Sequence, residues 1–344
     1  MKNFHTPIIT FCFKDVNVII IIVLENFTRK EKMKNKTALA YLMIFLVLLI
    51  WSVSPLLNAL LNEKCSVALR TAITGALSVL VLLLLCRKKL KKINVSYIKW
   101  AVPTGVFIAL ASLVQKIGLL YTTPTKYAFL ENLSCVVVPI ILFFAISKKP
   151  NFLTIISSVL CLVGSFVLSG MNFNGESLGF GKGEILCALS GVLYAFNIAY
   201  TGICIKKFDT MLYLLIQQMA LAISSLIFAV LFSVIKINGA PIEKLKFTFD
   251  LEVILIIIIL SLVSNLLCWC LRTYSMKFVN PTAVAVIMPF SAVITGVLSV
   301  LFKMDTISIE LVLGGVISLL AVVLSSIADI CFEKNDFKKK IKSS

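Results

Sequence analysis

Charged residues are scarce in this 344-residue sequence, and acidic ones are the scarcest. Only 14% of the residues are charged, with 16 Asp and Glu against 33 Lys and Arg, while 60% are hydrophobic. The mean hydropathy is +1.03. A soluble domain could not cover such a chain with polar groups. The scarcity of charge therefore excludes a soluble globular protein and predicts an integral membrane protein.

Histidine is nearly absent, and paired cysteine motifs are missing. The single histidine is His5, and the ten cysteines contain no CxxC pair. A zinc site, a haem held by histidine and a disulfide framework are therefore not expected. The sequence also has no HExxH, GxSxG or P-loop motif, so we expect no catalytic residues, no metal and no cofactor.

The hydrophobic residues are gathered in long runs that contain few charges. A helix needs about 20 residues to cross the hydrocarbon core of a bilayer. Stretches such as 79–85 and 255–260 do not alternate between apolar and polar residues, as strands of a membrane barrel would, so helices are favoured. The predicted spans are residues 37–60, 67–86, 97–121, 125–147, 152–171, 183–205, 211–235, 253–276, 281–302 and 308–331.

The ten predicted spans fall into two sets of five. Five crossings begin on one side of a membrane and end on the other, so the second set must run in the opposite orientation. Aligning Pro124 with Pro281 also places Gln115 on Arg272, which favours a repeat. We expect an all-α integral membrane protein with ten transmembrane helices as two inverted five-helix repeats. The expected segments are a leader at 1–32, repeats at 37–171 and 183–332, a linker at 172–182 and a basic tail at 333–344.

The leader fits this plan poorly. Residues 16–24 are apolar but too few to span a bilayer, and no small-residue cleavage site follows them. Met33 is followed by a Lys-Asn-Lys tripeptide, a normal start for a bacterial inner-membrane protein. Two interpretations stay open: translation begins at Met33, or the leader forms a helix at the membrane interface.

The net charge of +17 indicates orientation rather than nucleic-acid binding. Basic residues concentrate in the cytoplasmic loops of membrane proteins. In the predicted topology, the loops of one side hold the basic clusters at 29–36, 87–92, 148–149, 206–207 and 334–342. The loops of the other side hold more acidic residues. The sequence therefore predicts a multi-pass protein of the bacterial cytoplasmic membrane with both termini in the cytoplasm.

Residues 115–139, with the sequence QKIGLLYTTPTKYAFLENLSCVVVP, resemble the segment from helix 3 to helix 4 of EamA-type carriers in the drug/metabolite transporter superfamily. Shorter pieces fit the same pattern: Trp51-Ser52, Arg70, 183–209, Gln217-Gln218 and 280–289. The resemblance covers residues 37–332. It implies a ten-helix inner-membrane carrier, often a metabolite exporter, whose central cavity is lined mainly by helices 1, 3, 4, 6, 8 and 9.

Two charged residues stand where the family pattern usually has small neutral ones. Lys116 and Glu131 flank a predicted turn near Thr123. At 1.5 Å per residue, both side chains lie roughly 10–12 Å from the outer end. A lone charge at that depth costs about 2.5–3.5 kcal/mol or more, so we expect the two to face each other. Three alternatives stay open: the pair pins the hairpin, it lines the substrate path so that Glu131 binds a cation, an ammonium group or a proton, or one of the two residues faces the headgroups.

Other residues inside the spans are candidates for the same pocket. Trp51 and Trp269 lie deep enough to form apolar walls, although ordinary packing is the alternative. Arg70 either snorkels to the headgroups or closes an outer gate. Arg272, near the inner end of its helix, either forms an inner gate or anion contact or simply anchors the inner interface. Buried amides are expected mainly to bond between helices. The candidate substrate-binding residues are Trp51, Gln115, Lys116, Glu131, Tyr194, Asn197, Trp269 and Arg272, with Arg70 as a candidate gate.

The sequence favours a secondary carrier that moves a small organic metabolite across the cytoplasmic membrane by alternating access, more often outward than inward. The alternative is a non-transporting scaffold or sensor built on the same fold. A channel is less favoured because no repeated filter or ring of charge is present. The expected partners are a small-molecule substrate and the lipid bilayer, with no nucleic acid. Proton coupling through Glu131 and uncoupled transport both remain open, and the sequence does not specify an oligomeric state.

Overall fold

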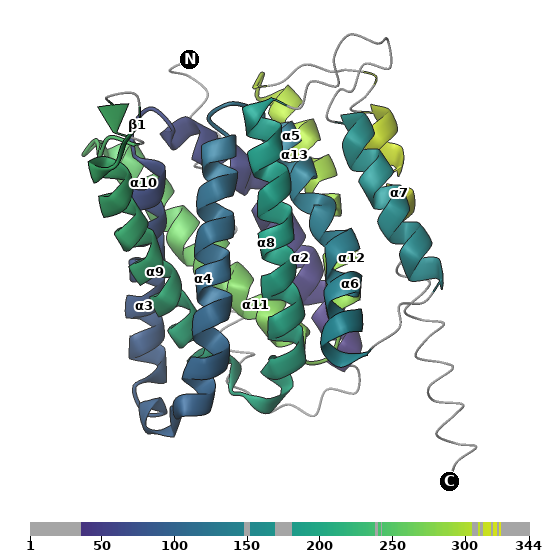
Figure 1. The fold of residues 1–344 in the computed structure, drawn as a ribbon, viewed down its shortest axis with the longest axis horizontal. Coiled ribbons are helices and arrows are strands. Elements are labelled where there is room, and N and C mark those ends of the chain that lie inside the picture. The colour runs from purple at the N-terminus through teal and green to yellow at the C-terminus, as the bar shows by residue number, and fades with distance from the viewer. Residues whose placement is uncertain are drawn as a thin grey trace.

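The computed structural model is built almost entirely of helices that run side by side in a bundle (Figure 1). It describes residues 36–147, 152–168, 181–237, 240–241, 243–304, 309, 312–317, 319–321 and 323–324. Within these residues a single small sheet occurs, in which β1 (Lys236–Ile237) pairs antiparallel with β2 (Ala240–Pro241). The longer helices are α2 (Lys36–Leu61), α3 (Val67–Cys86), α4 (Val95–Gly118), α5 (Pro124–Leu130), α6 (Ser134–Ile146), α7 (Phe152–Leu168), α8 (Lys182–Cys204), α9 (Thr210–Val234), α10 (Leu251–Ile259), α11 (Cys268–Ser275), α12 (Pro281–Ile287) and α13 (Phe290–Leu301). Shorter helical turns are η1 (Leu90–Lys92), η2 (Glu131–Leu133) and η3 (Ile205–Lys207), and η4 (Leu260–Leu267) is a π-helix.

Eight helical stretches of the described residues are long and apolar enough to cross a membrane. They coincide, to within three residues at each end, with the first four predicted spans and with spans six to nine. The fifth predicted span corresponds to α7, and parts of the tenth, including 312–317, are helical. The leader at 1–32, the tail at 333–344 and nearly all of the linker at 172–182 lie outside the described residues. The prediction of an all-helical membrane protein is confirmed.

The outer surface of the bundle is apolar, as a bilayer requires. Leu84 on α3, Phe144 on α6 and Val234 on α9 are exposed by 71%, 80% and 68%. Soluble monomers rarely expose contiguous apolar patches larger than a few hundred Å². Because large apolar side chains face outward along most of the helices, the surface is suited to lipid tails.

The two ends of the bundle differ in charge. Basic residues 87–92 connect α3 to α4 at the bottom of Figure 1, and η3 lies at the same end, where Lys89 Nζ is 2.9 Å from Asp209 Oδ2. We call this the basic end. The opposite end carries the β1–β2 hairpin, and we call it the hairpin end. There the side chain of Glu243 accepts hydrogen bonds from the amides of Val67 and Ala68 and so caps α3.

Three of the membrane-crossing helices are interrupted. The α5–α6 helix is broken by η2, the α10–α11 helix contains the π-helical segment η4, and the α12–α13 helix is broken at Met288–Pro289. π-Helical segments appear frequently at functional sites. The interruptions therefore mark regions of the bundle where the backbone departs from regular packing.

Of these three interruptions, only the one at Met288–Pro289 lies at a proline. Pro139 and Pro289 both remove a backbone hydrogen bond and favour kinks. The break beside Pro289 confirms this expectation, but Pro139 lies inside α6 and the break in its helix occurs at η2. The carbonyl of Cys135, which Pro139 leaves without its helical donor, accepts a hydrogen bond from Ser158 Oγ at 2.9 Å. Because Ser158 supplies that donor, the helix continues past Pro139.

Candidate functional site

A cavity of about 130 Å³ lies within the bundle. Engineered apolar cavities of about 150 Å³ admit benzene, so this space suits a small metabolite. Its walls come from α2, α3, α4, the α5–α6 helix, α8, the α10–α11 helix and the α12–α13 helix, with Leu221 of α9. The resemblance implied most of these helices but not α3, which contributes Arg70, Thr71 and Thr74.

The cavity brings together most of the predicted site residues, although they are widely separated in the sequence. Asn197 does not line it but is fully buried beside it. The predicted residues that do line it are Trp51, Arg70, Gln115, Lys116, Glu131, Tyr194, Trp269 and Arg272. Their positions make them available to a molecule in the cavity.

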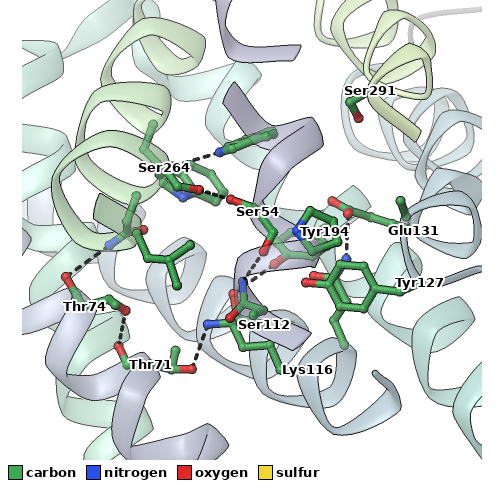
Figure 2. A pocket seen from close by; sticks show the side chains of 18 of the residues that line it. Ser54, Thr71, Thr74, Ser112, Lys116, Tyr127, Glu131, Tyr194, Ser264 and Ser291 are labelled. Carbon is green, nitrogen blue, oxygen red and sulfur yellow. Dashed lines mark hydrogen bonds between the residues drawn. The ribbon is translucent and has the colours of Figure 1, made fainter. Parts of the chain in front are cut away.

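The predicted pairing of Lys116 with Glu131 is wrong. Lys116 Nζ donates to Thr71 Oγ1 at 2.9 Å, and Glu131 Oε2 accepts from Gln115 Nε2 at 2.6 Å. Figure 2 shows Lys116 directed toward Thr71 and away from Glu131. Neighbouring residues on a helix differ in direction by about 100°, so matching depth did not determine which residue of α4 faces Glu131. That residue is Gln115.

Arg272 and two tryptophans form one wall. The rings of Trp51 and Trp269 meet edge to face with centroids 5.6 Å apart. Arg272 Cζ lies 4.6 Å from the centroid of Trp269 and 5.6 Å from that of Trp51, within the range of cation–π attraction. Arg272 Nη2 also donates to Asn197 Oδ1 at 3.3 Å. The hydrogen bond to Asn197 and the contacts with the two rings therefore fix the position of the Arg272 guanidinium. Arg272 does not extend to an interface.

Arg70 is also buried rather than directed to the headgroups. Its side chain is only 1% exposed. Nη1 donates to the carbonyl of Asn58 and Nη2 to Asn62 Oδ1, both at 3.0 Å. Of the two predicted roles, snorkelling is therefore wrong, and the side chain instead lies on the cavity wall near the hairpin end.

The break in the α5–α6 helix brings Glu131 to the cavity. A β-carbon at Gly191 of α8 would lie 2.7 Å from the carbonyl oxygen of Glu131, so only glycine permits this approach. On the same side, Tyr194 OH lies 2.9 Å from Ser112 Oγ in a hydrogen bond whose donor is either hydroxyl. Small residues let membrane helices pack closely, and here Gly191 lets α8 contact the interrupted segment.

A second polar group, which the sequence indicated only partly, surrounds η4. Asn265 Nδ2 donates to Gln218 Oε1 and to Ser78 Oγ, both at 3.0 Å, which confirms the expectation of bonding between helices. Ser264 accepts from Trp51 Nε1 at 2.8 Å through its carbonyl and hydrogen bonds to Ser54 through its hydroxyl (Figure 2). The sequence signal for Ser54 and Ser264 was only that small polar residues interrupt apolar runs.

Metal chemistry has no support among the residues that the structure describes. They contain no group of three His, Cys, Asp or Glu side chains that could hold a metal ion. The cavity instead offers hydrogen-bond donors, a carboxylate and aromatic faces. Such a mixture suits reversible recognition of a small molecule.

Comparisons with known proteins agree with this site. An "Uncharacterized transporter" of Archaeoglobus fulgidus is 24% identical over 232 residues, which cover 66% of this chain and 70% of that protein. One solved crystal structure, described only as a protein, matches with a TM-score of 0.63 at 15% identity, over 86% of this chain and 98% of its own, and so shares the fold. The sequence model of the EamA-like transporter family matches residues 38–170 and 181–327. Because that model accounts for most of the chain, the protein belongs to the EamA-like transporter family and is a multi-pass membrane transporter of small substrates.

Proposed function

We propose that this protein is a secondary carrier that moves a small organic metabolite across the bacterial cytoplasmic membrane by alternating access, as an exporter. The observation that carries the proposal is the cavity within the bundle, which combines apolar walls with several polar and charged side chains, holds space for a small molecule and lies among interrupted helices. Transporter sites lie typically near the bilayer midplane at discontinuous helices. A carrier needs such a site and helices that can rearrange around it.

Ten helices in two inverted five-helix repeats form the proposed architecture. Two segments of the chain match the same family model, which supports a repeat. The breaks at Glu131 and at Met288 each fall seven residues after the proline that opens the helix, Pro124 or Pro281. The repeats would comprise residues 37–171 and 183–332, joined by the linker at 172–182. Rocking of one repeat against the other would expose the cavity to each side in turn.

The side chains around the cavity divide into proposed roles. Trp51, Tyr194 and Trp269 form walls for the apolar part of the substrate, and Gln115, Lys116 and Arg272 provide hydrogen bonds. Asn197 positions Arg272. Arg70 closes the path toward the hairpin end, and Glu131 carries a proton if transport is coupled to one.

The proposed orientation places the basic end in the cytoplasm. Lys and Arg favour cytoplasmic loops, and residues 87–92 and 206–207 lie at that end. Both termini would then be cytoplasmic. The hairpin end would face outward, where Lys64 pairs with Glu252 at 2.7 Å and Lys126 with Glu184 at 3.6 Å.

Counterflow in proteoliposomes tests the proposal. A thermal-shift screen against amino acids, amines, nucleobases and sugar phosphates first selects a compound that stabilises the purified protein. Vesicles preloaded with that compound should then take up its labelled form faster than empty vesicles, because a carrier reorients faster when it is loaded on both sides.

Three results separate the alternatives. Trans-stimulated, saturable uptake supports a carrier. Flux that neither saturates nor responds to preloading would indicate a channel. Binding without any flux would indicate a scaffold or sensor and would overturn the proposal. Lys244→Gln, a substitution of an exposed lysine at the hairpin end, is the matched control for reconstitution.

A further inference from the structure

Basic side chains outnumber acidic ones around the cavity. Among the lining residues that the structure describes, Arg70, Lys116 and Arg272 are basic and Glu131 alone is acidic. The basic residues come from three different helices, α3, α4 and α11. Basic side chains from three separate helices thus line the same cavity within the bundle.

None of these basic side chains has a carboxylate partner within the described part of the chain. Arg70 donates to a backbone carbonyl and an amide oxygen, and Lys116 donates to the hydroxyl of Thr71. Arg272 donates to the amide oxygen of Asn197 and lies over two indole rings. Charges inside membranes are usually paired with opposite charges, but these three side chains form no ion pair with a described residue, and Glu131 alone offsets them within the described cavity lining.

Some of their donors are also unused. The Nε atoms of Arg70 and Arg272 are buried and have no hydrogen-bond acceptor. Lys116 has three N–H donors and its one acceptor in the structure is Thr71 Oγ1. A buried donor without an acceptor destabilises the folded protein, and the cost is greater on a charged group. The remaining N–H donors of Lys116, which lines the cavity, are available to an acceptor bound there.

Carboxylates near the cavity are already engaged elsewhere. Glu131 accepts a short hydrogen bond from Gln115. At the hairpin end, Glu243 caps α3, Glu252 pairs with Lys64 and Glu184 lies near Lys126. Glu131 is therefore the one carboxylate among the described lining residues, and the acidic residues of the hairpin end make their contacts outside the cavity lining.

We propose that the cavity recognises a small organic dianion, such as a dicarboxylate or a phosphate monoester. This inference rests on the proposed carrier function, because it names the class of substrate for the same cavity. Three positive and one negative side chain leave a formal excess of two positive charges, which a doubly negative molecule balances. Trp51 and Trp269 accept its carbon skeleton, and the volume of about 130 Å³ limits it to a small one.

A cationic or neutral substrate fits these groups less well. A cation would find one carboxylate, Glu131, and would add to three positive charges. A neutral molecule would leave those charges unbalanced in a low-dielectric site, where like charges repel strongly. Of the three, only a dianion balances the net formal charge of the wall.

Two matched sets of probes test the inference on the purified full chain. Succinate, succinamide and 1,4-diaminobutane share four carbons and carry two carboxylates, two amides and two amines, and glycerol 3-phosphate is compared with glycerol. Calorimetry measures binding, and tryptophan fluorescence reports it because Trp51 and Trp269 line the cavity. We expect succinate or glycerol 3-phosphate to bind at least tenfold more tightly than its uncharged partner and than the diamine.

Variants assign the binding to the cavity. Lys116→Gln and, independently, Arg272→Gln should each weaken binding of the anion about 10- to 100-fold, as expected for a lost charged hydrogen bond. The exposed control Lys244→Gln should leave it unchanged, and thermal unfolding shows which variants are folded. The inference is overturned if neither anion binds, if the amide or amine binds as tightly, or if the folded Gln variants bind like wild type.

Flux measurements keep this inference separate from the carrier proposal. Succinate or glycerol 3-phosphate that binds but never exchanges across vesicles would remove the carrier function and leave the anion site standing. Exchange of the amine or amide without binding of either anion would support the carrier function and overturn the anion site.

Discussion

The α5–α6 helix and the α12–α13 helix share a backbone plan but bring different chemistry to the cavity. Each starts with proline in its first turn, after a polar cap at Thr123 or Asn280. Each is then interrupted seven residues after that proline. At the interruption, however, the first helix presents Glu131 and the second presents Met288.

This difference indicates that the interrupted backbone of the two helices and their side chains at the cavity serve separate purposes. The two interrupted helices pack against each other, α5 against α13 and α6 against α12, and the proposed inverted repeats would give their matched breaks equivalent parts in a rearrangement. Ligand recognition needs no such symmetry, because a substrate is rarely symmetric. Accordingly, α3, α4 and the α5–α6 helix contribute Arg70, Lys116 and Glu131, while α11 contributes Arg272. Substitutions can test whether the two helices differ only in chemistry.

Glu131→Gln should have the largest effect. The new amide can still accept from Gln115, so the fold should persist, but it cannot carry a proton. If Glu131 couples transport, accumulation driven by a pH gradient should be abolished while exchange without a gradient continues. Flux in proteoliposomes with an imposed pH gradient measures this.

Met288→Gln supplies the comparison for that experiment. It places the same amide at the matched break and removes no ionisable group. Its rate can fall, but its response to the pH gradient should remain. A Glu131→Gln protein that still accumulates substrate on a pH gradient would show that Glu131 is not the proton carrier.

Gly191→Ala should lower the free energy of unfolding by about 1–3 kcal/mol, the usual cost of overpacking. Its β-carbon would meet the carbonyl of Glu131 at 2.7 Å, so α8 must shift from the break. Gly315→Ala is the control, because its β-carbon would lie 3.8 Å from Val293 Cγ1, an ordinary contact. Thermal unfolding in detergent compares the two, and equal stability would mean that the break tolerates displacement.

Removing the two caps should have equal and smaller effects. The side chains of Thr123 and Asn280 accept from the amides of Lys126 and Thr282, both at 3.4 Å. Thr123→Ala and Asn280→Ala should each cost about 1 kcal/mol, measured by reversible denaturation in mixed micelles. A clearly larger loss at one cap would show that the two helices differ in backbone as well as in side chains.

The charged cap of α9 should give the smallest effect. Burial raises the pKa of Asp209. The hydrogen bond and charge of Lys89 and the amides of Leu212 and Met211 lower it by a larger amount, so the net shift of the pKa is downward. A carboxyl with a depressed pKa adds stability above its unfolded pKa and loses it as the pH falls through the folded value. The acid side of the stability profile should therefore contain a step from Asp209.

Asp209→Asn keeps a capping side chain and removes the ion pair. We expect a loss within about 1 kcal/mol near neutral pH, because the pair is partly exposed, and loss of the acid step. Asn94, which caps α4 at the same end through Tyr97 N, is already neutral and supplies the pH-independent reference. Unfolding measured across acid pH compares the proteins, and an unchanged profile would remove Asp209 as its source.

Much of the fold could be predicted from the sequence because membrane insertion depends on local composition. Runs such as 67–86 predicted α3 to the residue, and Pro124 and Pro281 open helices as expected. Depth along a helix follows from counting residues, so Lys116 and Glu131 were both expected inside the bundle. Direction around the helix axis does not follow from counting, which is why Gln115 rather than Lys116 faces Glu131.

The sequence predicted the candidate site only in part, for the same reason. Trp51, Trp269 and Arg272 stood out because aromatic and charged residues are unusual deep in a span, and they lie together at the cavity. Thr71 and Ser264 did not stand out, since small polar residues are common in membrane helices. Their contacts with Lys116 and Trp51 arise from how neighbouring helices pack.

The sequence by itself determined that this chain is a helical membrane protein, where its helices begin and which residues are too polar for lipid. These follow from hydropathy, caps and prolines, which act within a few residues. Only the tertiary structure decided that Arg70, Lys116 and Arg272 meet around one cavity and form no ion pair with a carboxylate of the described residues. That arrangement depends on how each helix is rotated about its axis and on how closely the helices pack. Both are determined by contacts between residues that are far apart in the sequence.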